Sequence, residues 1–136
     1  MILNLWGKPK SCMRPRFSRF GTYDPQVHDK RESRKELLQQ FHQEPFEGPI
    51  QIQLFFNFSP PKGVAKKRIN SYYDAEVEYT KKPDIDNLIK YVLDVMNKTV
   101  FRDDAQVTDI IAKKSYTRTE GTVIILENKE HQDATD

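Results

Sequence analysis

The stretch from Asp84 to Asn97 constrains the fold of this chain more than any other, because its apolar residues recur at the spacing of one helical face. A helix with such a stripe must bury it against another element. Residues 50–58 supply a partner, since apolar and polar residues alternate there as in a strand that buries one face. The sequence therefore predicts a helix packed on a sheet. The apolar positions of the helix are Ile85, Leu88, Ile89, Val92, Val95 and Met96.

The remaining elements follow from weaker patterns. We expect a helix over residues 26–43, a short strand over 1–6, and two strands over 107–114 and 121–127 that form a hairpin. The basic residues 62–82 are expected to form a long ordered loop or excursion. Together these elements predict an α/β (α+β) fold with a small mixed sheet of about four strands and two main helices. A single domain would span residues 1–128, followed by a polar, acidic C-terminal tail over 129–136.

Composition excludes several classes of protein. The longest aliphatic run, Val123 to Leu126, is far shorter than the roughly 20 residues of a membrane span. The single cysteine, Cys12, excludes a disulfide framework and a cysteine-rich zinc site. With five glycines and no phosphate-binding glycine loop, an ATPase or dinucleotide enzyme is not expected. We therefore expect a soluble protein without a membrane partner, located in a reducing compartment such as the cytoplasm.

Two acidic runs carry the chemistry that the sequence suggests. Asp84 and Asp86 are two residues apart, and side chains at that spacing lie about 200° apart around a regular helix. They converge only if Pro83 keeps the chain extended and Asp84 stands at or before the N-cap. Lys90 then shares the helical face of Asp86, and Asp103–Asp104 supply further carboxylates from a separate segment.

Carboxylates crowded in this way repel one another unless a cation neutralises them. Oxygen ligands without a nearby histidine or thiolate suit Mg²⁺, with Mn²⁺ as a possible substitute, better than zinc. Such a site among basic and aromatic residues favours metal-assisted hydrolysis of a phosphodiester bond, with Lys90 holding the phosphate or stabilising the transition state.

Each of these residues also has an ordinary structural role open to it. Asp84 could simply cap the helix, and Asp86 could favour the helix dipole. Lys90 could form a surface ion pair with Asp86 or Asp94. Asp103–Asp104 could be turn residues.

Two basic segments hold the residues expected to bind DNA phosphates. The N-terminal segment alternates cations with Phe17, Phe20 and Tyr23, and the second segment contains Tyr72–Tyr73. These aromatic side chains could stack on exposed bases, or they could pack in the core or in loops. The expected DNA-binding residues are Arg14, Arg16, Arg19, Lys66, Lys67, Arg68, Lys81 and Lys82.

The run Asp84-Ile85-Asp86-Asn87-Leu88-Ile89-Lys90 resembles the Asp-x-Asp-Asn-Leu-x-Lys hallmark of the RusA-type Holliday junction resolvases. The run Asp103-Asp104-Ala105-Gln106-Val107 resembles their Asp-Asp-Ala/Ser-Gln-Val motif, and the order and separation of the two runs also match. The resemblance covers residues 3–127 loosely and 82–115 closely, and we do not trace it through residues 62–82.

This resemblance implies a small α/β fold, a homodimer and Mg²⁺-dependent cleavage of four-way DNA junctions in recombination and repair. Relatives of this type are common in phage and prophage genomes. The resemblance also implies that Asp84, Asp86 and Asp104 are the essential acidic residues and that Lys90 is the essential lysine. Asp103 would be an outer ligand of the metal.

The predicted function is that of a structure-specific endodeoxyribonuclease that places paired symmetrical nicks in Holliday junctions. Two such cuts need two identical sites, which a two-fold dimer provides. Leu37, Leu38 and Phe41 are either residues of the dimer interface or packing within the subunit. The alternatives are a non-catalytic accessory protein that binds branched DNA and a broader nuclease that cuts flaps or forks.

Overall fold

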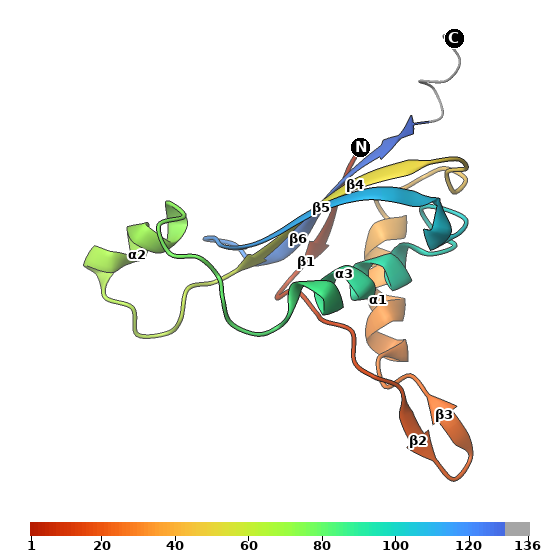
Figure 1. Ribbon diagram of the computed structural model, residues 1–136, viewed down its shortest axis with the longest axis horizontal. Helices are drawn as coiled ribbons and strands as arrows, with labels where there is room; N and C mark the ends of the chain where they lie inside the picture. Colours follow the sequence, from red (N-terminus) through yellow and green to blue (C-terminus); the bar gives the residue numbers. More distant parts are fainter. Residues whose placement is uncertain (130–136) are drawn as a thin grey trace.

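The structure is a computed structural model that describes residues 1–129 (Figure 1). Its centre is a four-stranded sheet in the order β1 (Ile2–Trp6), β6 (Gly121–Asn128), β4 (Ile50–Phe58) and β5 (Val107–Tyr116). β6 pairs antiparallel with both β1 and β4, whereas β4 and β5 run parallel. The mixed α/β architecture with a four-stranded sheet confirms the predicted fold class.

Two helices, α1 (Val27–Leu38) and α3 (Ile85–Met96), share a core with one face of this sheet. Their buried side chains, among them Leu37 and Leu88, join the inward-facing row of β4 that includes Ile52 and Leu54. The predicted helix over residues 84–97 is confirmed as α3. α1 is shorter than predicted and ends at Leu38, but the turn that follows still brings Phe41 into the core. Leu37 and Phe41 are therefore packing residues of the subunit.

A third helix, α2 (Lys66–Tyr73), lies within the segment that the sequence predicted to be a loop. None of its residues is buried. The helix was missed because it is only eight residues long and its apolar side chains, Ile69, Tyr72 and Tyr73, are only partly buried. Figure 1 shows it at the far end of an excursion that leaves the sheet after β4 and returns to α3.

The predicted hairpin between the last two strands is wrong. β5 and β6 lie on opposite sides of β4 and do not pair with each other. Their connection, residues 117–120, passes the end of β4, where the backbone N–H of Thr117 donates to the carbonyl of Phe58 at 2.8 Å. The short spacing favoured a hairpin, but β4 provides ladder partners along both of its edges and separates the two strands.

The basic, turn-rich N-terminal stretch contains a small hairpin of β2 (Arg16–Ser18) and β3 (Gly21–Tyr23), which projects away from the sheet (Figure 1). A single 3₁₀ turn, η1 (Asp104–Gln106), precedes β5. β6 extends to Asn128, and Lys129, the first residue of the predicted tail over 129–136, is hydrogen-bonded to Pro49 and paired with Asp109. The rest of that tail lies outside the described residues. Within residues 1–129, no helix combines the length and the apolar character needed to cross a membrane.

Candidate functional site

The first acidic run lies at the start of α3, as predicted. Asp84 is the N-cap residue with an extended backbone (φ −71°, ψ 144°), after a cis Lys82–Pro83 peptide bond, and Asp86 is in the first turn. The Asp84 side chain makes no capping hydrogen bond to the backbone of the helix. Asp84 instead pairs with the Lys82 ammonium at 2.9 Å, and Asp86 accepts from the backbone N–H of Asn87 at 2.9 Å. Both side chains are exposed and open to a ligand from solution.

The segment before α3 is fixed to the sheet by contacts that the sequence did not indicate. The ammonium of Lys114, on β5, donates to the carbonyls of Lys81 at 2.9 Å and Pro83 at 3.0 Å. The hydroxyl of Tyr79 donates to the carbonyl of Lys82 at 2.8 Å, and its ring stacks on Phe58 with centroids 4.4 Å apart. These contacts join residues far apart in the sequence, so no local pattern could have revealed them.

The second acidic run forms a hydrogen-bonded turn at η1. Asp103 accepts from the backbone N–H of Ala105 at 3.2 Å, and the Gln106 side chain accepts from the Asp103 N–H at 2.8 Å. Gln106 also donates to the carbonyls of Phe46 and Gly48, which ties the turn to the loop before β4.

The two carboxyl groups of this turn differ in proton affinity. The Ala105 N–H, followed by a hydrogen bond shared with Asp104, lowers the pKa of Asp103. The same shared hydrogen bond, together with slight desolvation and the negative charges of Asp103 and Asp94, raises the pKa of Asp104. Asp104 is therefore the member of the pair that holds a proton more readily.

Lys90 lies one turn beyond Asp86 and lines a hollow of about 200 Å³ against the N-terminal segment. Met13 and Arg14 form the opposite wall of this hollow. The backbone N–H of Cys12 donates to the carbonyl of Asn87 at 2.8 Å, so the N-terminal segment is bonded directly to the first turns of α3.

Asp84, Asp86 and Asp104, which were predicted to bind one cation together, do not form a cluster within the described part of a single chain. Within residues 1–129, no three Asp, Glu, His or Cys side chains are placed to hold one metal ion. Asp84 is turned toward Lys82, and the carboxylates whose charge reaches Asp104 are Asp103 and Asp94. Within the described residues, Asp84 and Asp86 thus lie at the start of α3 without forming a three-carboxylate group with Asp104.

An ion-pair cluster that the sequence did not indicate lies farther along the same helix. The buried ammonium of Lys30, on α1, contacts the carboxylates of Asp24 at 2.7 Å and Asp94 at 3.2 Å. Burial by itself disfavours the charge of Lys30, but the hydrogen bonds to the two carboxylates outweigh it and raise the pKa of the lysine. Asp94 is therefore a structural residue that holds α1 against α3.

The eight expected DNA-binding residues are all exposed, and they fall into three groups. Figure 1 shows the β2–β3 hairpin and α2 projecting in different directions, with the start of α3 between them in this view. The three groups are Arg14, Arg16 and Arg19 on or beside the hairpin, Lys66, Lys67 and Arg68 in the first turn of α2, and Lys81 and Lys82 before α3.

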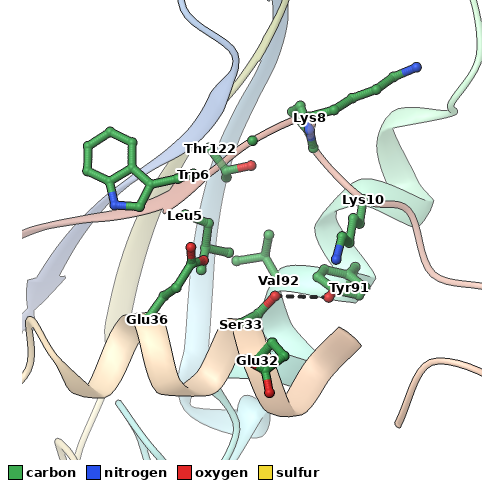
Figure 2. Close-up of a pocket in the computed structure, with 12 residues that line it drawn as sticks. Leu5, Trp6, Lys8, Lys10, Glu32, Ser33, Glu36, Tyr91, Val92 and Thr122 are labelled. Carbon is green, nitrogen blue, oxygen red and sulfur yellow. Dashed lines mark hydrogen bonds between the residues drawn. The ribbon is translucent and has the colours of Figure 1, made fainter. Parts of the chain in front are cut away.

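A separate hollow of about 160 Å³ lies between the end of β1, α1 and α3 (Figure 2). At its floor, the hydroxyls of Ser33 and Tyr91 are 3.0 Å apart and hydrogen-bonded. Burial raises the pKa of Glu36 on its wall, although the backbone N–H of Trp6 donates to that carboxylate and opposes the shift. None of the predicted site residues lines this hollow, so it is separate from the two acidic runs.

Comparison with known proteins gives a family match over most of the chain. The family model described as Endodeoxyribonuclease RusA matches residues 7–127, nearly the whole chain. "Uncharacterized protein YqaN" of Bacillus subtilis (strain 168) is 34% identical to the chain over 71 residues, which are 51% of this chain and 50% of that protein. The match thus spans about half the length of this curated relative.

Proposed function

The chain belongs to the RusA endodeoxyribonuclease family, and on that premise we propose that it is a structure-specific endodeoxyribonuclease that resolves four-way DNA junctions. It would act in recombination and repair by placing paired symmetrical nicks across a Holliday junction. The observation that carries the proposal is the family match over residues 7–127, which includes both acidic runs and the lysine between them. The exposure of Asp84, Asp86, Lys90 and Asp104 supports it, because a DNA backbone can reach all four side chains.

The contacts around Asp84 suggest how DNA would engage this part of the molecule. Lys82 is 84% exposed and its ammonium pairs with Asp84. A phosphate that binds Lys82 would compete for that ammonium and leave the Asp84 carboxylate free. Lys90, on the same helical face as Asp86, is then placed to hold the phosphate or to stabilise negative charge that develops on it.

We propose Mg²⁺, with Mn²⁺ as a substitute, as the cofactor, held by Asp84, Asp86 and Asp104 with Asp103 as an outer ligand. The donors fit the ion by chemistry, since all are exposed carboxylates, although the described part of one chain does not gather three of them. Mg²⁺ commonly takes one or two carboxylates, keeps several waters and uses substrate phosphates as further ligands. When bound, the ion would activate a water and stabilise charge on the phosphate.

We also propose that the active form is a homodimer, because one chain carries a single set of acidic residues and a junction needs two symmetrical cuts. The face of the sheet opposite α1 and α3 supports this. Ile2 and Ile111 are 62% and 58% exposed there, and the strand register aligns them in one row with Ile125 and Gln53. A second copy packed on this face would bury the row. We expect Ile111→Lys to sediment as a monomer, and an unchanged dimer would exclude this face.

The activity is tested with a synthetic four-way junction incubated with and without Mg²⁺. We expect symmetrical nicks that disappear with EDTA, and we expect Asp84→Asn and Asp104→Asn to abolish cutting while junction binding survives. Asp74→Asn, an exposed acid at the end of α2, is the matched control and should cut normally.

The outcomes separate the proposal from its alternatives. Full activity of either site variant would contradict the site assignment. A shifted band without products, with or without metal, would favour a non-catalytic protein that binds branched DNA. Equal cutting of flaps, forks and four-way junctions in a panel of branched substrates would favour a broader nuclease.

A further inference from the structure

The β2–β3 hairpin presents two phenylalanine rings to solvent. Phe17 is 85% exposed and Phe20 is 86% exposed, more than any other large apolar side chain within residues 1–129. Neither ring stabilises the fold by burial, because both remain in water. Two exposed aromatic rings on one projecting hairpin indicate a surface that binds a ligand.

The tip of the hairpin is held in shape by its own contacts. The hydroxyl of Ser18 accepts from the backbone N–H of Phe20 and donates to the carbonyl of Gly21, each at 3.2 Å. Gly21 has φ +116°, a conformation that favours glycine and allows the tight return of the chain. The guanidinium of Arg19 lies 5.0 Å from the centroid of the Phe20 ring. The ring of Phe20 is thus displayed at the turn beside a cation.

The base of the hairpin is fixed relative to α3. The buried side chain of Gln26 accepts from the backbone N–H of Met13 and donates to the carbonyl of Ser11, each at 2.8 Å. Asp24, at the other end of the hairpin, accepts from the backbone N–H of Gln26 at 2.8 Å and binds Lys30. The hairpin therefore projects from a polar clamp that also holds the helix on which Lys90 lies.

The charge around the two rings selects an anionic partner. Residues 1–23 contain no acidic residue. Arg14, Arg16 and Arg19 are exposed, and none of them forms an ion pair with another described residue. Flat aromatic rings flanked by unpaired cations match nucleobases flanked by phosphates. Bases inside a continuous duplex are stacked on each other, so the rings would reach them only where stacking is interrupted.

We propose that the hairpin stacks on DNA bases. Phe17 and Phe20 would stack on bases exposed at a branch point, while Arg14, Arg16 and Arg19 bind the neighbouring phosphates. The choice of a branched substrate rests on the proposed function, but the stacking does not require cleavage. The hairpin would add preference for branched over linear DNA to the binding that the basic residues provide.

The experiment measures binding in EDTA, so that no cutting occurs. The full chain is titrated into a four-way junction that carries 2-aminopurine next to the branch point, and into a linear duplex of the same sequence with the same probe. We expect the wild type to change the fluorescence of the junction probe. The Phe17→Ala/Phe20→Ala variant should lose that change and bind the junction at least tenfold more weakly. Its affinity for the duplex should change by less than about twofold, because the arginines remain.

Two further variants test whether the loss of junction binding is caused by the loss of ring stacking. Trp6→Ala removes an aromatic side chain that is 66% exposed at the end of β1 and should bind the junction like the wild type. Phe17→Tyr/Phe20→Tyr retains both rings and should restore the fluorescence change. Because Phe17 and Phe20 are exposed, thermal unfolding of the alanine variant should match that of the wild type, which excludes misfolding as the cause.

Three outcomes would overturn the inference. The alanine variant could keep both the fluorescence change and the affinity for the junction. It could lose affinity for junction and duplex equally, which would mean that the rings do not recognise the branch. It could also become monomeric in sedimentation, which would make the hairpin a contact between subunits. If instead the probe responds as expected but no branched DNA is ever cut, the proposed function fails and the stacking role stands.

Discussion

The two basic, aromatic projections of this molecule have similar compositions and opposite arrangements of their aromatic rings. In the β2–β3 hairpin, Phe17 and Phe20 point into solvent. In the excursion between β4 and α3, Tyr72 and Tyr79 pack edge-to-face or at a tilt on Tyr116, with centroids 4.9 Å apart in each case. The rings of the excursion therefore attach it to the sheet, whereas the rings of the hairpin are free to bind a ligand.

The two projections are also anchored by different forces. The excursion is held by ring stacking on Phe58 and by the Lys114 ammonium, which bridges two carbonyls ahead of α3. The hairpin is held by a polar clamp in which Lys30 and Gln26 satisfy the surrounding carboxylates and backbone groups. The difference teaches that the aromatic rings of a basic segment are available to stack on bases only where they do not pack on the rest of the fold.

The two projections should differ most in how much their aromatic rings contribute to the free energy of unfolding. We expect Tyr79→Ala to lower the free energy of unfolding by about 2–3 kcal/mol, because the ring stacks on the core residue Phe58 and its hydroxyl holds the carbonyl of Lys82. Phe20→Ala should change it by no more than about 0.5 kcal/mol, because that ring is exposed. Urea denaturation of both variants measures the difference. Equal losses would show that the hairpin rings are packed in solution.

Disrupting the polar clamp at the base of the hairpin, in which Lys30 binds Asp24 and Asp94, should have the next largest effect. Lys30→Met keeps most of the side-chain volume but leaves Asp24 and Asp94 without their cation, and should cost about 2 kcal/mol. Trypsin should then cut faster after Arg16 and Arg19, because the base of the hairpin loosens. The matched control is Lys35→Met, whose exposed pair with Glu32 should be worth less than about 0.5 kcal/mol. An unchanged rate of cleavage would mean that the clamp does not hold the hairpin.

The contribution of the clamp should depend on pH in a defined direction. The hydrogen bond from Lys30, followed by that from the Gln26 N–H, lowers the pKa of Asp24, so its contribution is present above the ordinary aspartate pKa and disappears as the pH falls through the lowered value. The pKa of Lys30 is raised, so its contribution is present below the ordinary lysine pKa and disappears as the pH rises through the raised value.

The stability difference between wild type and Lys30→Met should therefore be constant from about pH 5 to pH 9 and shrink outside that window. Urea denaturation of the two proteins at about pH 3, 7 and 11 measures it. A difference that stayed the same at about pH 3 would show that the pair with Asp24 contributes nothing.

The smallest effects should come from single phosphate contacts. Arg16→Ala in the hairpin and Lys66→Ala in α2 should each reduce the slope of log affinity against log salt by about one, with junction and duplex affected alike. Lys35→Ala, on α1 and outside the basic segments, should leave the slope unchanged. If only Arg16→Ala lowers the slope, the excursion does not contact DNA.

The sequence was sufficient to predict the helices and strands whose hydrophobic pattern lies within a short stretch of residues. The alternation of residues 50–58 and the apolar stripe of residues 85–96 gave β4 and α3, and Pro83 followed by Asp84 gave the position of the helix start. In each case the periodicity reflects burial of one side of the element. The sequence did not predict α2, because eight residues with only Ile69, Tyr72 and Tyr73 on their apolar side are too few to establish a helical period.

The sequence did not determine relations between distant segments. It could not place β4 between β5 and β6, because a short connection between two strands is compatible with a hairpin as well as with an inserted strand. For the same reason it could not show that Asp84, Asp86 and Asp104 form no common ligand group within residues 1–129.

The sequence by itself therefore determined the α/β class, the two main helices and the family resemblance. Only the tertiary structure decided that Tyr79 packs while Phe20 is exposed, that Asp94 is paired with Lys30, and which acidic residues are neighbours. The physical reason is that hydrogen-bonding capacity and hydrophobicity belong to each residue, whereas burial and pairing depend on which distant residues the fold brings beside it.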